Sequence, residues 1–240
     1  MLHVENTENY AGVTISGDNY DFEELYEALH SIVGEEDDHP AYEGARIRVL
    51  AVCYDLRHAL MGTRTAVNKP NGLDRERMRH LGFVGSDHNV YYQFEVLWPE
   101  LLFVSFALND FIEIHESSKT VHAWNAESAA VRKFQAAVGQ CLQETLTEKK
   151  FANIKKYFSY SAYNNFAHYA TQYIDKLNID FIRMDKVKRF NHISIMAKRV
   201  AVRDQNYLNA QTLIREAAAE MGVSQLDVRY GEEYPDEIDW

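Results

Sequence analysis

Apolar residues recur along this chain mainly at helical spacing. The clearest helix extends from Phe22 to Val33, where the apolar positions form one face. Asp21 and Glu24 have the spacing of a capping box at its start, and Gly34 is typical of a helix end. A second helix is predicted from residue 42 to 61. One of its faces carries Ile47, Leu50, Ala51, Tyr54, His58 and Met61.

Two segments have a strand-like pattern. Residues 10–16 are β-prone and end at a turn cluster, and residues 89–98 alternate with a period of two. The second strand needs a partner for its backbone groups, and we expect that partner to be the first strand. Residues 63–71 predict a loop, and Asp74 is a typical cap for a short helix that ends at Leu81.

The segment from Pro99 to Glu116 is apolar nearly all round, which predicts a helix buried on most sides at the centre of the fold. The remaining segments predict helices at 126–146, 151–158, 162–177, 186–201 and 204–221, and a last strand at 226–230. The fold class is therefore α+β and predominantly helical, with helices around a buried central helix and a small antiparallel sheet. Without a Gly/Ser-rich linker, residues 1–240 predict a single domain with an acidic surface tail at 232–240.

Composition narrows the classes of function. The chain has 240 residues and a formal net charge of -11, which repels phosphate backbones and makes a nucleic-acid partner unfavourable. Cys53 and Cys141 lie in helical patterns without a second thiol nearby, as in a reducing compartment. The N-terminus lacks the pattern of an export signal, and no apolar run has membrane-spanning length. We therefore expect a cytoplasmic protein with no membrane association.

Acidic and histidine side chains on the predicted helices suggest one metal-binding hypothesis. Glu27 and His30 are three residues apart, and Asp55 and His58 repeat this spacing. The predicted central helix adds Asp110 and Glu113. A carboxylate and an imidazole at this spacing hold metals in helical bundles. The alternative is that the histidine makes its hydrogen bonds within the core, and that the acidic residues of the central helix mark the point where this helix emerges into water.

The segment Arg75–His80 has the Arg-x4-His spacing of helical HEPN-type RNases, a motif that also recurs by chance. Glu76 follows the arginine where that motif has Asn, His or Asp, and the acidic balance opposes an RNA substrate.

Aromatic and amide residues are dense between residues 157 and 173. Phe166, Tyr169 and Tyr173 predict a buried stripe. Tyr163, Asn164, Asn165 and His168 are the candidates for an exposed patch that binds a partner.

Several segments resemble an uncharacterised family of bacterial cytosolic proteins of Gram-positive type. These segments are residues 4–13, 20–26, 52–58 and 92–114. The resemblance implies a bacterial origin and carries no activity or site residue.

Binding of a protein or small-molecule partner, without catalysis and without a cofactor, is the main hypothesis. It rests on the acidic charge and on the missing motifs for phosphate, serine-hydrolase and zinc-protease chemistry. The alternative is a metal-dependent, hydrolase-like enzyme with a divalent metal ion, and the third hypothesis is the RNase. A homo-oligomer is compatible with all three.

Overall fold

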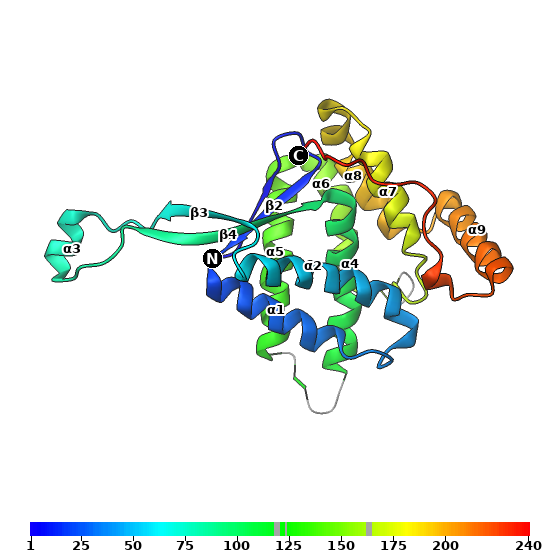
Figure 1. Ribbon diagram of the computed structural model, residues 1–240, viewed down its shortest axis with the longest axis horizontal. Coiled ribbons are helices and arrows are strands. Elements are labelled where there is room, and N and C mark those ends of the chain that lie inside the picture. Colours follow the sequence, from blue (N-terminus) through cyan, green and yellow to red (C-terminus); the bar gives the residue numbers. More distant parts are fainter. Residues whose placement is uncertain (118–120, 123, 162–164) are drawn as a thin grey trace.

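The computed structural model describes residues 1–117, 121–122, 124–161 and 165–240. Figure 1 shows a helical body from which a narrow arm projects on one side. The described residues confirm the α+β class, with mostly helices and a small antiparallel sheet. Within these residues no helix is both long and apolar enough to cross a membrane.

Helices account for most of the body. Within the described ranges they are α1 (Asn19–Val33), α2 (Glu43–Leu60), α3 (Arg75–Leu81), α4 (Trp98–Glu116), α5 (Ala126–Thr145), α6 (Glu148–Ile154), α7 (Gln172–Ile182), α8 (Lys186–Ala201) and α9 (Gln205–Met221). Short 3₁₀ helices lie at Pro40–Tyr42, Lys155–Tyr157 and Gln225–Asp227.

Helix α4 carries much of the core. Every side chain from Leu101 to Ile112 is buried, and α4 contacts α1, α2, α5, α7 and α8. At its start, Trp98 is fully buried, and its Nε1 donates a hydrogen bond of 3.2 Å to Asn6 Oδ1. The apolar sequence of α4 is thus matched by burial until its last turn.

The sheet has four strands in the order β1-β2-β4-β3, and all neighbours are antiparallel. The strands are β1 (His3–Asn6), β2 (Gly12–Gly17), β3 (Thr65–Pro70) and β4 (His88–Leu97). The predicted pairing of the N-terminal strand with residues 89–98 is confirmed as β2 with β4. Glycine is required at residue 12, because a Cβ there would lie 2.0 Å from the Val96 carbonyl oxygen.

The arm comprises residues 62–91, with β3, α3 and the outer part of β4. All of its residues are described, and none is buried. In Figure 1, α3 lies at its tip, far from the body. The prediction of a loop at 63–71 was wrong. Strand β3 has no buried residue, so it lacks the alternation of apolar and polar residues by which a half-buried strand is predicted.

The start of α1 also differs from the prediction. The capping box is formed by Asp18 and Asp21, one turn before the predicted pair. Asp18 Oδ1 accepts a hydrogen bond of 3.0 Å from the Asp21 N–H, and Asp21 Oδ2 accepts one of 3.3 Å from the Asp18 N–H. The usual capping box has Glu or Gln at its second position, whereas here both positions are Asp. The prediction looked for Glu and therefore selected Asp21 and Glu24.

Two segments lack the predicted regular structure because their backbone groups bond elsewhere. The described residues 165–171 are not helical, since the His168 N–H donates to Ala41 O at 2.6 Å and the Ala170 N–H donates to Tyr207 Oη at 3.0 Å. Residues 226–230 form no strand. The Gln172 side-chain amide instead donates to Gln225 O at 2.6 Å and Val228 O at 2.8 Å.

The cap of α1 gives a prediction about stability. Asp18→Ala removes the hydrogen bond to the Asp21 N–H, and we expect the free energy of unfolding to fall by about 1 kcal/mol. Urea denaturation at neutral pH measures this change.

Asp74→Ala is the matched control, because Asp74 caps α3 through a bond of 2.7 Å from the Arg77 N–H. No residue of α3 is buried, so we expect the unfolding of the body to change by less than about 0.5 kcal/mol. Equal losses in both variants would contradict the separation of the arm from the body.

Candidate functional site

The candidate metal ligands on α1 and α2 lie at the surface or have partners within the chain. Glu27 and His30 are exposed, and the His30 ring lies 4.6 Å from the Tyr26 ring. Asp55 Oδ1 accepts a hydrogen bond of 2.5 Å from Arg64, and His58 Nδ1 lies 2.9 Å from Thr63 Oγ1.

On α4 the candidates separate by burial, because Asp110 is buried and Glu113 is exposed. In the described part of the chain, no group of three or more His, Cys, Asp or Glu side chains is placed to hold a metal ion. The metal centre therefore stays a prediction that the geometry does not support.

Asp110 instead holds a loop in place. Its Oδ2 accepts a hydrogen bond from the Phe166 backbone N–H at the wall of a cleft of about 280 Å³. Burial raises the pKa of Asp110 from its ordinary value near 3.8 to about 6, although the Phe166 N–H and Arg203 favour the anion. The Asp110 carboxyl therefore has a structural role, because it accepts the backbone hydrogen bond that holds this loop.

The other predicted residues fall into two groups. Tyr163 and Asn164 lie outside the described residues. Asn165 is half-buried, and His168 is exposed with a left-handed φ of 53°. The RNase motif Arg75–His80 lies on α3, at the exposed tip of the arm.

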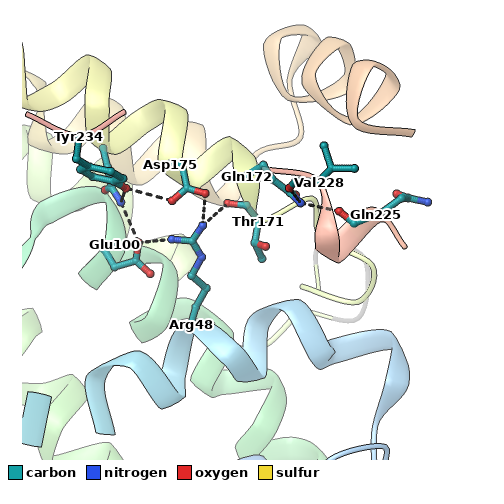
Figure 2. Close-up of polar contacts among 9 residues, drawn as sticks. Arg48, Glu100, Thr171, Gln172, Asp175, Gln225, Val228 and Tyr234 are labelled. Carbon is teal, nitrogen blue, oxygen red and sulfur yellow. Dashed lines mark hydrogen bonds and ion pairs between the residues drawn. The ribbon is translucent and has the colours of Figure 1, made fainter. Parts of the chain in front are cut away.

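A polar cluster that the sequence analysis missed joins four parts of the body around Arg48 of α2. Figure 2 shows its guanidinium pointing at Glu100 of α4 and Asp175 of α7. Arg48 Nη1 donates to Glu100 Oε2 at 2.9 Å, and Nη2 donates to Asp175 Oδ2 at 2.6 Å and to Thr171 O at 3.0 Å. The fourth part is the C-terminal strap, residues 222–240, which contributes Tyr234.

Tyr234 fastens the strap to this Arg48 cluster. Its Oη donates to Asp175 Oδ1 at 3.1 Å, and it accepts a bond of 3.0 Å from Asn178 Nδ2. The same Asn178 amide donates to Glu100 Oε2 at 2.9 Å. Figure 2 shows Tyr234 lying over the cluster. The strap thus covers charged groups that would otherwise face water.

Burial and charge oppose each other in the cluster. Burial disfavours the Arg48 cation, but Glu100 and Asp175 overcome this effect and raise its pKa. Burial raises the pKa of Glu100, and Arg48 only partly offsets the rise. Glu100 Oε1 and Asn178 Oδ1 are buried without a hydrogen-bond partner among the described residues. One guanidinium therefore serves two carboxylates, and Tyr234 of the strap adds a hydrogen bond to Asp175 and one from Asn178.

A cleft of about 460 Å³ lies between α2, α7 and the strap. Arg48, Asp175 and Tyr234 line it from the Arg48 cluster, and Ile47 and Ala51 line it from α2. Leu226, Val228, Tyr230 and other strap residues complete the lining. Arg48 and Asp175 make one part of the cleft lining charged, and the Arg48 guanidinium is already paired with two carboxylates. Ile47 and Ala51 connect the cleft to the apolar outer surface of α2.

That outer surface is the apolar face of α2 that the sequence pattern indicated, except for Leu50, which packs against the core, and it faces solvent. Its large side chains are strongly exposed: Ile47 at 50 %, Tyr54 at 59 % and Met61 at 62 %. The buried face is a second apolar face, formed by Ala45, Val49, Val52, Cys53, Leu56 and Ala59. Helix α2 therefore has two apolar faces, and we call the exposed one the open face.

Comparison with known proteins identifies a family without an assigned activity. A family model described as a domain of unknown function (DUF6904) matches residues 2–240. No curated protein and no solved structure matches the chain.

Asp110 predicts a pH dependence of stability. Between its unfolded pKa near 3.8 and its folded pKa of about 6, the folded chain holds a proton that the unfolded chain releases. The stabilisation is complete below the unfolded pKa and is lost as the pH rises through about 6. We expect Asp110→Asn, which keeps an acceptor for the Phe166 N–H, to remove this dependence.

Relative to the variant, the wild type should lose on the order of 2–3 kcal/mol of unfolding free energy between about pH 4 and pH 7. Urea denaturation of both proteins across this range measures the difference. Parallel pH curves would show that the Asp110 carboxyl is not held in its protonated form.

The strap gives a second prediction. Tyr234→Phe removes the hydrogen bonds to Asp175 and Asn178, and we expect cleavage of the strap after Glu232 and Glu233 to accelerate roughly tenfold. Limited digestion with a glutamate-specific protease, followed by mass spectrometry, measures this rate.

Tyr230→Phe is the matched control on the same strap, because within the described part of the chain its Oη donates just one hydrogen bond, of 3.1 Å, to the exposed Glu232. It should leave the cleavage rate unchanged. The prediction fails if the two variants are cleaved at the same rate.

Proposed function

The chain belongs to the DUF6904 family, and we propose that it acts by binding a protein partner, without catalysis, through the open face of α2. The supporting observation is that this face stays apolar and exposed while the opposite face of the same helix fills the core. Large apolar side chains gathered on one exposed surface are typical of interaction sites.

The spacing of the open face indicates the kind of partner. Ile47, Ala51, Tyr54, His58 and Met61 follow one another at intervals of four, three, four and three residues. This is the spacing of the a and d positions of a coiled coil, which pack against the side chains of a second helix. The fitting partner is therefore an amphipathic helix with an apolar stripe of matching length.

The cleft extends this surface at one end. Ile47 and Ala51 belong both to the open face and to the cleft lining. A partner helix on α2 would therefore place its end, or the residues that follow it, beside the strap. Tyr230 and Val228 offer apolar contacts there, and the exposed Arg229 offers a charged one.

The described residues offer little support for catalysis by a thiol. Burial raises the pKa of the Cys53 thiol to about 12 and that of Cys141 to about 11. Both are therefore protonated and unreactive at neutral pH. Two buried free thiols also support a reducing compartment, so we extend the proposal to a cytoplasmic protein, and the sequence resemblance extends it to a bacterial one.

A variant of the open face tests the proposal. A photo-crosslinking phenylalanine analogue at Tyr54 should trap one specific protein in an extract of the native cells, to be identified by mass spectrometry. With that protein purified, Ala51→Glu should weaken its binding at least roughly tenfold, because the glutamate places an unpaired charge at the centre of the interface. Calorimetry measures the affinity.

Val187→Glu is the control, since Val187 is an apolar residue of α8 with 68 % exposure. It should bind the partner like the wild type. Equal affinities for the wild type and Ala51→Glu would contradict the proposal, and so would an adduct whose protein does not bind the wild type.

A further inference from the structure

The arm separates charge from the rest of the molecule. Residues 62–91 contain five Lys and Arg residues and three Asp and Glu residues, a formal charge of +2. Because the whole chain carries -11, the remainder carries -13. A basic, exposed arm on a strongly acidic body is suited to an acidic partner surface.

The positive charge is concentrated at the arm tip. Arg75, Arg77 and Arg79 are exposed on α3, and none of them forms an ion pair with another described residue, although Arg77 Nη1 donates a hydrogen bond of 2.6 Å to Gly72 O. Large apolar side chains follow them at the same tip and are also exposed, with Leu81 at 65 % and Val84 at 95 %. The tip thus combines exposed guanidinium groups that have no ion-pair partner among the described residues with apolar surface, as the central residues of protein interfaces do.

A matching acidic surface lies on α1. Glu23 and Glu27 are one helical turn apart on its exposed side, and neither forms an ion pair with a described residue. Glu24 is bound by Lys133 at 3.1 Å, and Tyr20 beside it is 81 % exposed. Figure 1 shows that α1 begins on the side of the body from which the arm projects.

The arm also carries an open sheet edge. Among the described residues, strand β3 is the last strand in the sheet order and pairs with β4 alone, so its outer backbone groups have no strand partner there. An unpaired edge strand can add a strand of a second chain, although Lys69 and Pro70 at the end of β3 limit such pairing to its first part. Two arms lying side by side in opposite directions would bring each tip to the side of the partner body on which α1 begins.

We propose that the arm joins two copies of this chain, with Arg75, Arg77 and Arg79 of one copy bound to Glu23 and Glu27 on α1 of the other. The contact is reciprocal about a twofold axis, so each copy contributes one basic tip and one acidic helix face. It uses surfaces distinct from the open face of α2, which stays free for a different partner.

Charge reversal tests the pairing. One variant carries Arg75→Glu, Arg77→Glu and Arg79→Glu, and the other carries Glu23→Lys and Glu27→Lys. Sedimentation equilibrium of the full chain should show a wild-type dimer that weakens as salt is added. Each variant alone should have a dimer dissociation constant raised roughly a hundredfold, because like charges then face each other.

Mixing the two variants is the decisive step, since every tip then faces a helix of opposite charge. The mixture should form a heterodimer with an affinity near that of the wild type. Circular dichroism confirms the folding of each variant, and Ala51→Glu should leave the dimer intact, which separates this proposal from the one for the open face.

Three results would overturn the proposal. They are a wild type that stays monomeric up to its solubility limit, a tip variant that stays dimeric, and a mixture that forms no heterodimer. A monomer that binds duplex DNA or RNA through the arm would equally overturn it and would assign the basic tip to nucleic acid.

Discussion

The half-buried guanidinium of Arg48 constrains the right-hand half of this fold, as drawn in Figure 1. It bonds to Glu100 of α4 and to Thr171 and Asp175 of α7, so three helices must meet at one point. Removing a charge from water is costly unless it is paired and hydrogen-bonded, which gives each of these contacts a fixed geometry. The strap is thereby joined to this cluster, because Tyr234 donates a hydrogen bond to Asp175 and accepts one from Asn178. The acidic tail is for this reason held against the body at its middle, and again at its end, where Arg189 donates to Asp239 O at 2.7 Å.

The same cluster explains how α2 keeps an exposed apolar face. Arg48 lies between the two faces and is anchored from the α7 side, which fixes the rotation of α2 about its axis. With that rotation fixed, Val49, Val52 and Leu56 fill the core, and Tyr54 must face outward. The helix therefore cannot bury its second face by turning. Any gain from covering the open face has to come from another molecule.

Sequence patterns predicted the elements whose signals are local. The end of α1 at Gly34 follows from short-range chemistry, and so do the cap of α3 at Asp74 and its end at Leu81. The pairing of β2 with β4 followed from the need to satisfy a lone strand. What could not be predicted depends on distant partners. In the sequence, Arg48 is merely a charged residue inside an apolar helix. Its partner Asp175 lies 127 residues away, so no local pattern connects the two. Nor could periodicity choose between the two apolar faces of α2, because both have helical spacing.

The arm raises a different question, namely how thirty residues without a buried side chain hold one conformation. A two-stranded ribbon is marginally stable on its own, so local contacts must contribute. Asn71 provides several, since its side-chain amide donates to Ser86 O at 2.9 Å and its Oδ1 accepts from the Leu73 N–H at 3.0 Å. Lys69 lies over the Tyr91 ring at 5.3 Å. These contacts order the ribbon but leave the apolar and cationic groups of its tip in water. A chain that maintains such a projection outside its packed body has separated recognition from stability. The body would keep its whole hydrophobic core if the tip were removed. The residues of the tip are therefore constrained by the partner they bind and not by the packing of the body.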